Sequence, residues 1–181
     1  MIRVEKLFVT FGKGTPLEKR ALDGIDLAIE PGGIVGVIGP NGAGKSTLLS
    51  AIAGDVPATG GRIIIDDVDV TGQSTARRSP RVARVFQDPL AGSCGQLTIE
   101  ENLALAVARG QHRAFGHALN QGRRALFRER VVALGLGLET RLHDRMALLS
   151  GGQRQALALV MATLAKSSVL LLDEHTAALD P

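Results

Sequence analysis

Residues 39–47, GPNGAGKST, match the pattern Gly-x-x-x-x-Gly-Lys-Ser, whose residue types suit the binding of a polyphosphate. Glycines accept the backbone angles that turn N–H groups inward, and they let phosphate oxygens approach closely. Lys45 supplies a positive charge to the outer phosphates, and the Ser46 hydroxyl has the chemistry of a Mg²⁺ ligand. We therefore expect a loop that binds ATP and Mg²⁺ through Gly39, Pro40, Asn41, Gly42, Ala43, Gly44, Lys45, Ser46 and Thr47.

The segments on either side of this loop support that interpretation. Ile34–Gly39, IVGVIG, is apolar on both faces, which is typical of a parallel strand covered by helices on each side. A helical pattern begins near Lys45 and ends at Gly54, so the positive end of its dipole would point at the phosphates. Strand, loop and helix in this order are typical of a P-loop nucleotide-binding core.

The second chemical motif is the acidic pair Asp173 and Glu174, directly after the apolar run Val169–Leu172. In a P-loop enzyme that run forms a buried strand beside Ile34–Gly39, and its first acid faces Ser46 across the Mg²⁺. Glu174 is then placed to orient or deprotonate the water that attacks the γ-phosphate. The alternative is that the two acids only end a strand or start a turn.

The third motif is LSGGQRQ, Leu149–Gln155, in front of an apolar helical pattern. Ser150 has the chemistry of a helix N-cap, and Gly151 and Gly152 leave N–H groups bare at the positive end of that helix. A plain Ser-Gly-Gly helix start is the alternative. If the motif does bind an anion, one chain carries two helix starts for phosphate, and two copies facing each other would let one ATP use both.

These three motifs, in this order, resemble the ATP-binding cassette (ABC) family, and the resemblance covers nearly the whole chain. It implies an ATPase in which two identical subunits face head to tail, each offering its signature segment to the γ-phosphate of the other. That segment consists of Ser150, Gly151, Gly152 and Gln153. The resemblance also implies catalytic roles for Lys45, Gln87 and Glu174, and a metal bound by Ser46, Gln87 and Asp173.

Three further residues match the family between and beyond these motifs. Gln87, in VFQDP, resembles the glutamine that contacts Mg²⁺ or the attacking water, although an ordinary exposed residue at a strand end is the alternative. Phe11 resembles the aromatic residue that stacks on adenine, with Phe8 as the other candidate. Asp180 matches the loop that crosses the dimer interface.

Local patterns predict the elements that hold these motifs. Alternating apolar residues predict antiparallel strands at the start of the chain, with further strands at 62–67 and 81–86. Thr98 followed by Glu101 forms a capping box and predicts a helix from Ile99. The remaining predicted elements are strands over Ile2–Val9 and Ile25–Ile29 and helices reaching over 99–108, 123–135 and 151–166.

The expected fold class is α/β, with a P-loop core containing a mostly parallel sheet, an N-terminal antiparallel β subdomain and a helical subdomain. We expect residues 1–87 to hold the β subdomain and core, 88–150 the helical subdomain, and 151–181 the signature helix and last strand. Complete cassettes of the family continue past Asp180 with another strand and a histidine at the γ-phosphate. We therefore expect a C-terminally incomplete cassette that binds ATP weakly and hydrolyses it slowly.

Bulk composition limits the functional classes. A chain of 181 residues that is 45% hydrophobic can bury a sizeable core, and its net charge of +3 does not by itself indicate a nucleic-acid partner. The single cysteine, Cys94, cannot form an internal disulfide, which fits a reducing cytoplasm. No apolar run reaches the roughly 18 residues that cross a bilayer.

Within the family, the motifs look most like ATP-binding subunits of bacterial importers for tryptophan, tyrosine or related small solutes. The expected partners are a second copy of the chain, membrane-spanning permease subunits and an extracellular solute-binding protein, at the cytoplasmic face of the cell membrane and without cargo contact. One alternative is an ABC-type ATPase acting on the ribosome or DNA, although the spacing of Lys45 and Ser150 excludes an inserted coiled coil. Another is a non-hydrolysing nucleotide-binding module, which Glu174 argues against.

Two groups of arginines have three interpretations. They are a solvated face, a surface for anionic lipid headgroups near a docked partner, or a nucleic-acid surface. The first group is Arg77, Arg78, Arg81 and Arg84, and the second is Arg109, Arg113, Arg123, Arg124, Arg128 and Arg130.

Overall fold

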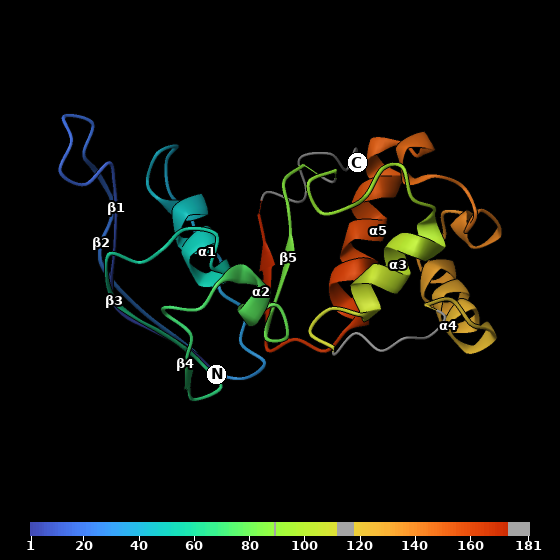
Figure 1. The fold of residues 1–181 in the computed structure, drawn as a ribbon, viewed down its shortest axis with the longest axis horizontal. Helices are drawn as coiled ribbons and strands as arrows, with labels where there is room; N and C mark the ends of the chain where they lie inside the picture. The colour runs from blue at the N-terminus through green and yellow to red at the C-terminus, as the bar shows by residue number, and fades with distance from the viewer. Residues whose placement is uncertain (89, 112–117, 174–181) are drawn as a thin grey trace. The chain divides into compact units, whose positions relative to one another are not determined.

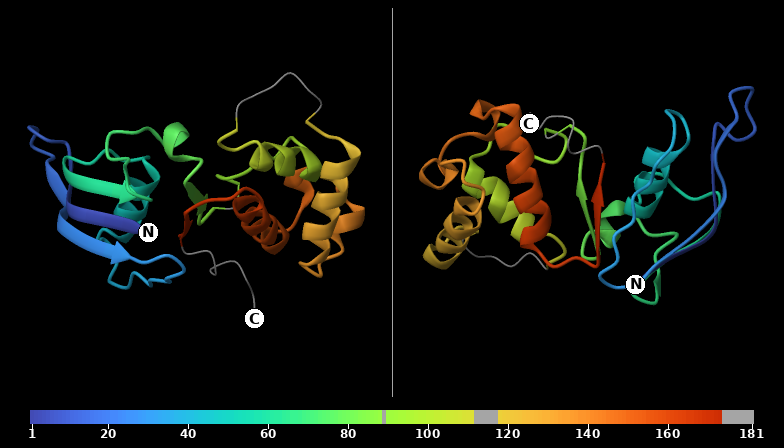
Figure 2. Two further views of the ribbon diagram at one scale, coloured as in Figure 1. Left: turned by 90° about the horizontal axis from the view of Figure 1, so that it is seen from below. Right: turned by 180° about the vertical axis from the view of Figure 1, so that it is seen from behind.

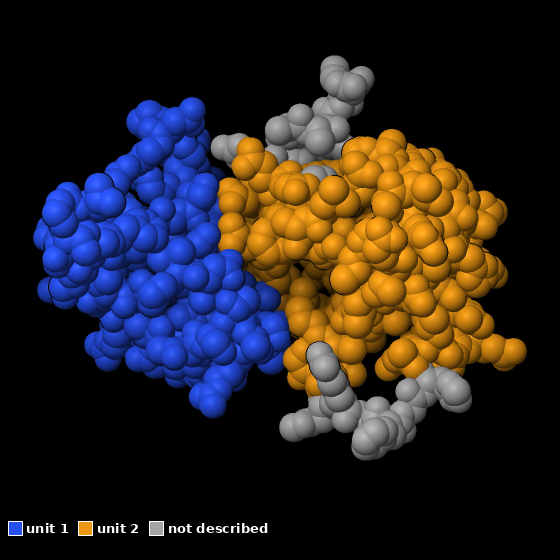
Figure 3. Space-filling model, turned by 45° about the horizontal axis from the view of Figure 1, so that its top comes forward, with its two compact units in different colours: residues 1–82 blue, residues 83–181 orange. Residues whose placement is uncertain are grey.

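The computed structural model describes residues 1–88, 90–111 and 118–173. The chain divides into two compact units, Met1–Val82 and Ala83–Pro181, which Figure 3 shows in different colours. Glu174 and Asp180, both predicted to act at the ATP site, lie outside the described residues. None of the helices in the described part of the chain is long and apolar enough to span a membrane.

The first unit contains the predicted antiparallel sheet (Figure 1). Its strands run in the order β2-β1-β3-β4, and each neighbouring pair is antiparallel. The early strands were expected from alternation in the sequence, and that expectation is confirmed. The bounds are Ile2–Phe11 for β1, Lys19–Ile29 for β2, Gly60–Ile65 for β3 and Val68–Asp69 for β4.

A bulge in β1 explains why its apolar residues alternate imperfectly. Val4 and Leu7 are both buried although they are three residues apart, and the pairing register shifts between them. Lys6, which lies between them, has a φ of 45°. Across the sheet, a Cβ on Gly61 would come 2.1 Å from the Lys6 carbonyl oxygen, so this register requires glycine there.

Helix α1, Lys45–Ala53, packs on the sheet through β2 and ends where the sequence predicted. Its C-cap, Gly54, has the left-handed conformation that commonly ends helices. A short helix, α2 (Thr75–Arg78), follows β4 and brings Arg78 to the end of α1. The core of this unit is made by apolar side chains of the sheet and of α1.

The second unit contains the predicted helical block and two strands (Figures 1 and 2). Strand β5, which starts at the unit boundary, pairs with β6 in a sheet of two strands. Helix α5 packs on β5 through Ala158 and Ala162, and it also contributes to an apolar core shared with α3 and α4. The bounds are Val82–Val85 for β5, Ile99–Val107 for α3, Gln121–Val132 for α4, Leu138–Thr140 for η1, Met146–Leu148 for η2, Gly151–Leu164 for α5 and Val169–Leu172 for β6.

The prediction of a buried parallel strand at Ile34–Gly39 is wrong for this structure. Residues 31–40 lie outside every described sheet, and the side chains of Ile34 and Ile38 are 98% and 97% exposed. A strand that is apolar on both faces becomes buried only if neighbouring strands and covering helices enclose it. The expected neighbour Val169–Leu172 pairs with β5 instead.

Candidate nucleotide-binding site

The predicted phosphate-binding loop, residues 39–47, is closed by its own lysine. The Nζ atom of Lys45 donates hydrogen bonds to the carbonyl oxygens of Gly39 at 2.8 Å and Pro40 at 3.0 Å. The N–H group of Ala43 also donates to the Pro40 carbonyl at 3.2 Å. These contacts curl the loop around the lysine side chain, so the positive charge lies inside it. An anion entering the loop would meet that charge directly.

Two glycines give the loop its shape. Gly42 and Gly44 have φ angles of 83° and 90°, a region that side-chain-bearing residues rarely adopt. A Cβ on Gly44 would also lie 2.6 Å from the carbonyl oxygen of Ala21 on β2. Gly44 begins α1 without a side-chain cap. The first-turn N–H groups of a helix have no intrahelical partner, so this start of α1 is suited to binding phosphate oxygens.

The two candidate phenylalanines lie in different surroundings. Phe8 is half-buried, and its ring lies near Gly24 and Gly60, where added Cβ atoms would come 3.2 and 3.3 Å from it. Phe11 is 45% exposed at the end of β1 and pairs with Lys19, close in sequence to the Ala21 that Gly44 contacts. An exposed ring is free to stack on a base, so Phe11 remains the predicted adenine-stacking residue.

The signature segment begins α5 with the cap that the sequence predicted. Ser150 Oγ accepts a hydrogen bond from the Gln153 N–H at 3.3 Å, and Gln153 Oε1 accepts one from the Ser150 N–H at 3.1 Å. Ser150 and Gly151 are exposed. A Cβ on Gly151 would meet no atom within 4 Å, so packing does not explain this glycine. The close approach of a ligand to the backbone would explain it.

The acid after β6 lies beside an arginine. Asp173 Oδ2 accepts a hydrogen bond from Arg84 Nη2 at 2.9 Å, and both side chains are largely buried. The Arg84 guanidinium also lies 4.8 Å from the centre of the Phe86 ring. Sequence reasoning missed this partner, because Arg84 was grouped with surface arginines. Gln87 lies two residues past the end of β5.

The oxygen ligands predicted for Mg²⁺ fit the chemistry of that ion. A hydroxyl, a carboxylate and an amide carbonyl are hard ligands, and Mg²⁺ commonly binds few protein groups because substrate phosphates and waters complete its shell. The described residues contain no cluster of three or more His, Cys, Asp or Glu side chains that could hold a metal by themselves. Ser46 belongs to the first unit, whereas Gln87 and Asp173 belong to the second.

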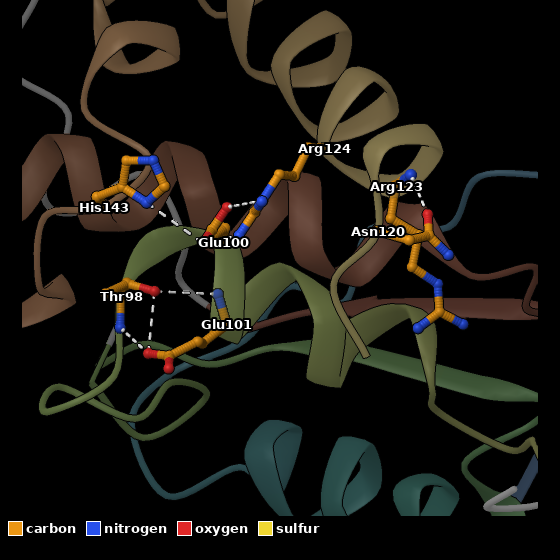
Figure 4. Close-up of polar contacts among 7 residues, drawn as sticks. All are labelled: Thr98, Glu100, Glu101, Asn120, Arg123, Arg124 and His143. Carbon is orange, nitrogen blue, oxygen red and sulfur yellow. Dashed lines mark hydrogen bonds and ion pairs between the residues drawn. The ribbon is translucent and has the colours of Figure 1, made fainter. Parts of the chain in front are cut away.

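Polar contacts join the helices of the second unit (Figure 4). The predicted capping box of α3 is present, since Glu101 accepts from the Thr98 N–H at 2.7 Å and Thr98 Oγ1 accepts from the Glu101 N–H at 3.3 Å. Glu100 is buried and accepts from Arg124 Nε at 3.0 Å, with His143 Nδ1 3.3 Å away. This carboxylate therefore connects α3 to α4 and to the chain before the signature.

Two of the arginines that were grouped as basic clusters in the sequence form hydrogen bonds at the ends of different helices. Arg78 is buried against α1, and Arg109 donates to the Ala162 and Ala165 carbonyls, both at 3.1 Å, at the end of α5. Burial lowers the pKa of Arg109. A single solvated basic face is therefore wrong for these members, which support the ends of helices.

Comparisons with known proteins agree with the geometry. The model of the family described as "ABC transporter" matches residues 22–177. The chain is 39% identical over 185 residues to "Tyrosine transport ATP-binding protein" of Clostridioides difficile (strain R20291), covering all of this chain and 72% of that protein. It is 42% identical over 156 residues to "Thiamine import ATP-binding protein ThiQ" of Yersinia pestis, covering 86% of this chain and 61% of that protein.

Solved structures give the same result. The dimeric structure of a post-hydrolysis state of the ATP-binding cassette MJ0796, bound to ADP and Pi, matches with a TM-score of 0.83 at 28% identity. That match covers 99% of this chain and 76% of that chain. A second dimeric structure of MJ0796, a bacterial ABC transporter cassette, also has a TM-score of 0.83. The predicted fold class is thereby confirmed.

Proposed function

Because the chain belongs to the ABC transporter family, a family of ATPases, we propose that it powers the import of a small solute by ATP-driven, head-to-tail dimerisation. Both relatives described above are named for import or transport of an organic molecule, tyrosine in one and thiamine in the other. The proposed solute class is an amino acid or a similar small molecule. The proposed partners are permease subunits in the cell membrane and an extracellular solute-binding protein, with the chain at the cytoplasmic face.

The observation that carries this proposal is the exposed start of α5. Gly151 has open space where a Cβ would be, and Ser150 caps the helix while remaining exposed. The start of α1 is a second anion site, and it has its own lysine. Each helix start suits phosphate. If two copies face each other and each presents its signature segment to the other's nucleotide, every ATP contacts the start of α1 from one copy and the start of α5 from the other.

Each predicted residue has a role in this proposal. Phe11 stacks on adenine, the loop of residues 39–47 binds the phosphates, and Lys45 neutralises charge that develops on the γ-phosphate. Glu174 orients or deprotonates the attacking water, and Gln87 contacts that water or the Mg²⁺. Asp180 contacts the facing subunit. Ser46, Gln87 and Asp173 would hold a Mg²⁺ ion, which would supply positive charge to the phosphates.

A pair of substitutions at Ser150 tests the proposal in a protein that also carries Glu174→Gln, which is expected to bind ATP without hydrolysing it. With ATP, this protein should form dimers that sediment as such, and without ATP it should be monomeric. Ser150→Asp keeps a good N-cap but places a negative charge against the facing triphosphate, so ATP-dependent dimerisation should weaken by at least about tenfold.

Ser150→Asn is the matched control, because asparagine caps helices as well as aspartate and carries no charge. It should preserve the fold and lose much less dimerisation than Ser150→Asp. Equal dimerisation of the two variants with ATP would contradict a phosphate contact at this helix start. A Glu174→Gln protein that stays monomeric at high concentration with ATP would contradict the proposed function itself.

A further inference from the structure

A buried amide on α3 connects two parts of the second unit. The Asn102 side chain is 1% exposed, and its Oδ1 accepts the Cys94 N–H at 2.8 Å. Its Nδ2 donates to the carbonyls of Cys94 at 3.0 Å, Leu97 at 3.3 Å and Thr98 at 2.9 Å. Both amide N–H groups and the oxygen are therefore used. One side chain fixes the backbone of residues 94–98.

Those five residues are hydrogen-bonded in turn to the chain that leads into the signature. The Ala147 N–H donates to the Gly95 carbonyl and the Met146 N–H to the Leu97 carbonyl, each at 3.0 Å. Thr98 forms an isolated antiparallel bridge with Arg145. These backbone contacts give residues 94–98 and 145–147 a fixed register.

Residues 145–147 are connected to Ser150 through the turn η2 and Leu149. The turn η2 ends at Leu148, and the Leu149 N–H donates to the Met146 carbonyl at 3.3 Å. The Arg154 guanidinium donates to the Leu149 carbonyl, which ties the turn to the first turn of α5. Met146 and Leu149 are buried in the same apolar core as Leu103 of α3. The position of Ser150 therefore depends on residues 94–98.

On their N-terminal side, residues 94–98 are connected to Gln87 by a short segment that begins at Asp88. Asp88 accepts hydrogen bonds from the Leu90 N–H through Oδ1 at 2.9 Å and from the Ala91 N–H through its carbonyl at 3.0 Å. A further turn, in which the Ser93 N–H donates to the Leu90 carbonyl at 3.2 Å, leads on to Cys94. Residues 94–98, which the Asn102 side chain holds, therefore follow Gln87 along the chain after only a few residues.

We infer that Asn102 is a positioning residue that couples the segment after Gln87 to the start of α5, so that Ser150 is held where the facing subunit's ATP requires it. This inference rests on the proposed function. Asn102 is far along the chain from the phosphate-binding loop, which belongs to the first unit. Its loss should therefore leave ATP binding to a single copy intact while weakening the dimer.

The test compares Asn102→Ala with Asn120→Ala in the Glu174→Gln protein. Asn120 is the N-cap of α4, where its Oδ1 accepts the Arg123 N–H at 2.9 Å (Figure 4). Within the described part of the chain, its side chain makes no hydrogen bond to residues 94–98 or 145–147. Both variants lose a structural asparagine. ATP affinity at dilutions where the protein is monomeric, the dissociation constant of the ATP-bound dimer and amide hydrogen exchange are measured for each.

Asn102→Ala should weaken the ATP-bound dimer by at least about tenfold and leave monomer ATP affinity within about twofold. Exchange at Cys94, Met146 and Ala147 should become faster. Asn120→Ala should leave the dimer within about twofold. Equal weakening by both variants, or dimerisation unaffected by Asn102→Ala, would overturn the positioning role.

A milder variant keeps the test informative if Asn102→Ala does not fold. In Asn102→Ser the hydroxyl can still bond the carbonyl of Thr98, four residues earlier on the helix, but it cannot reach Cys94 and Leu97. It should also weaken the dimer by several fold with unchanged monomer affinity, and an unweakened dimer would overturn the inference. If the Glu174→Gln parent does not dimerise with ATP, the proposed function fails first and this inference falls with it.

Discussion

At the scale of single residues, Arg78 shows how a charge that looks like surface in the sequence can be structural. Its side chain is 1% exposed, and it donates to the carbonyls of Ala51 at 2.6 Å and Ile52 at 2.9 Å. Burial lowers the pKa of Arg78, and the carboxylates of Asp55 and Asp69 partly oppose that shift. The guanidinium stays charged at neutral pH and satisfies the carbonyl end of α1.

We expect Arg78→Met to destabilise the protein by about 3 kcal/mol, because buried carbonyls at the end of α1 would lose charged hydrogen-bond donors. Arg78 also donates to the carbonyls of Thr71 at 2.8 Å and Gln73 at 3.0 Å, so the turn before α2 would loosen as well. Urea unfolding of the variant measures the loss. Arg77→Met is the control, since Arg77 is exposed, and a similar loss there would contradict this role for Arg78.

At the scale of elements, the capping boxes of α3 and α5 use the same chemistry in different settings. Glu101 is a charged N3 partner of Thr98, whereas Gln153 is a neutral N3 partner of Ser150. Hydrogen bonds from the Thr98 N–H and hydroxyl lower the pKa of Glu101 from its ordinary value of 4.5. Because the folded state favours the ionised form, this stabilisation is present above pH 4.5 and is lost as the pH falls through the folded-state pKa.

The start of α3 should therefore be acid-sensitive, and that of α5 should not. In Glu101→Gln the box keeps its shape but loses the ionised partner, so the variant should be less stable than the wild type at pH 7. The difference should shrink as the pH is lowered below 4.5, since the wild type then loses its advantage. Urea midpoints of both proteins measured across this range provide the check, and a difference independent of pH would contradict it.

At the scale of the whole molecule, the two helix starts belong to different compact units. The start of α1 lies in Met1–Val82 and the start of α5 in Ala83–Pro181. A bound triphosphate that needs both starts from two copies makes nucleotide occupancy and dimerisation one equilibrium. The proposed transport cycle depends on that linkage, because closure and opening of the dimer would move the permease partners.

Cysteine cross-linking should reveal the head-to-tail arrangement. Cys94 is free and exposed, so it is first replaced by serine in the Glu174→Gln protein. One copy then carries Asn41→Cys and another carries Ser150→Cys, both at exposed positions. An intermolecular disulfide should form when the two are mixed with ATP, and much less without ATP. Cross-linking that is equally efficient without nucleotide would contradict ATP as the agent that brings the two segments together.

Much of the fold was predictable because its signals are local. The Thr98–Glu101 capping box predicted the start of α3, Ser150 as an N-cap predicted the start of α5, and Gly54 predicted the end of α1. The antiparallel strands followed from alternation, and the bulge at Lys6 explains its irregularity. These features depend on neighbours in the chain, so a single sequence contains them.

Features that depend on distant partners were missed or wrong. The apolar pattern of Ile34–Gly39 indicated a preference for burial but could not specify which strands would enclose it. Arg84 and Asp173 are paired across two strands, and no sequence spacing indicates that contact. Asn102 carried one signal that reasoning could have used, an uncharged polar residue directly before the apolar run Leu103–Val107 of α3.

The sequence by itself determined the family and the capped start of α5, and it predicted the phosphate-binding loop, because the residues of each motif are contiguous and their chemistry acts over one turn or loop. Only the tertiary structure decided that Arg78 closes the end of α1, that Arg84 neutralises Asp173, and that Asn102 fixes residues 94–98, whose backbone is bonded in turn to the chain before Ser150. Burial and hydrogen bonding between segments remote in sequence depend on where the backbone places them, and that placement arises only when the chain folds.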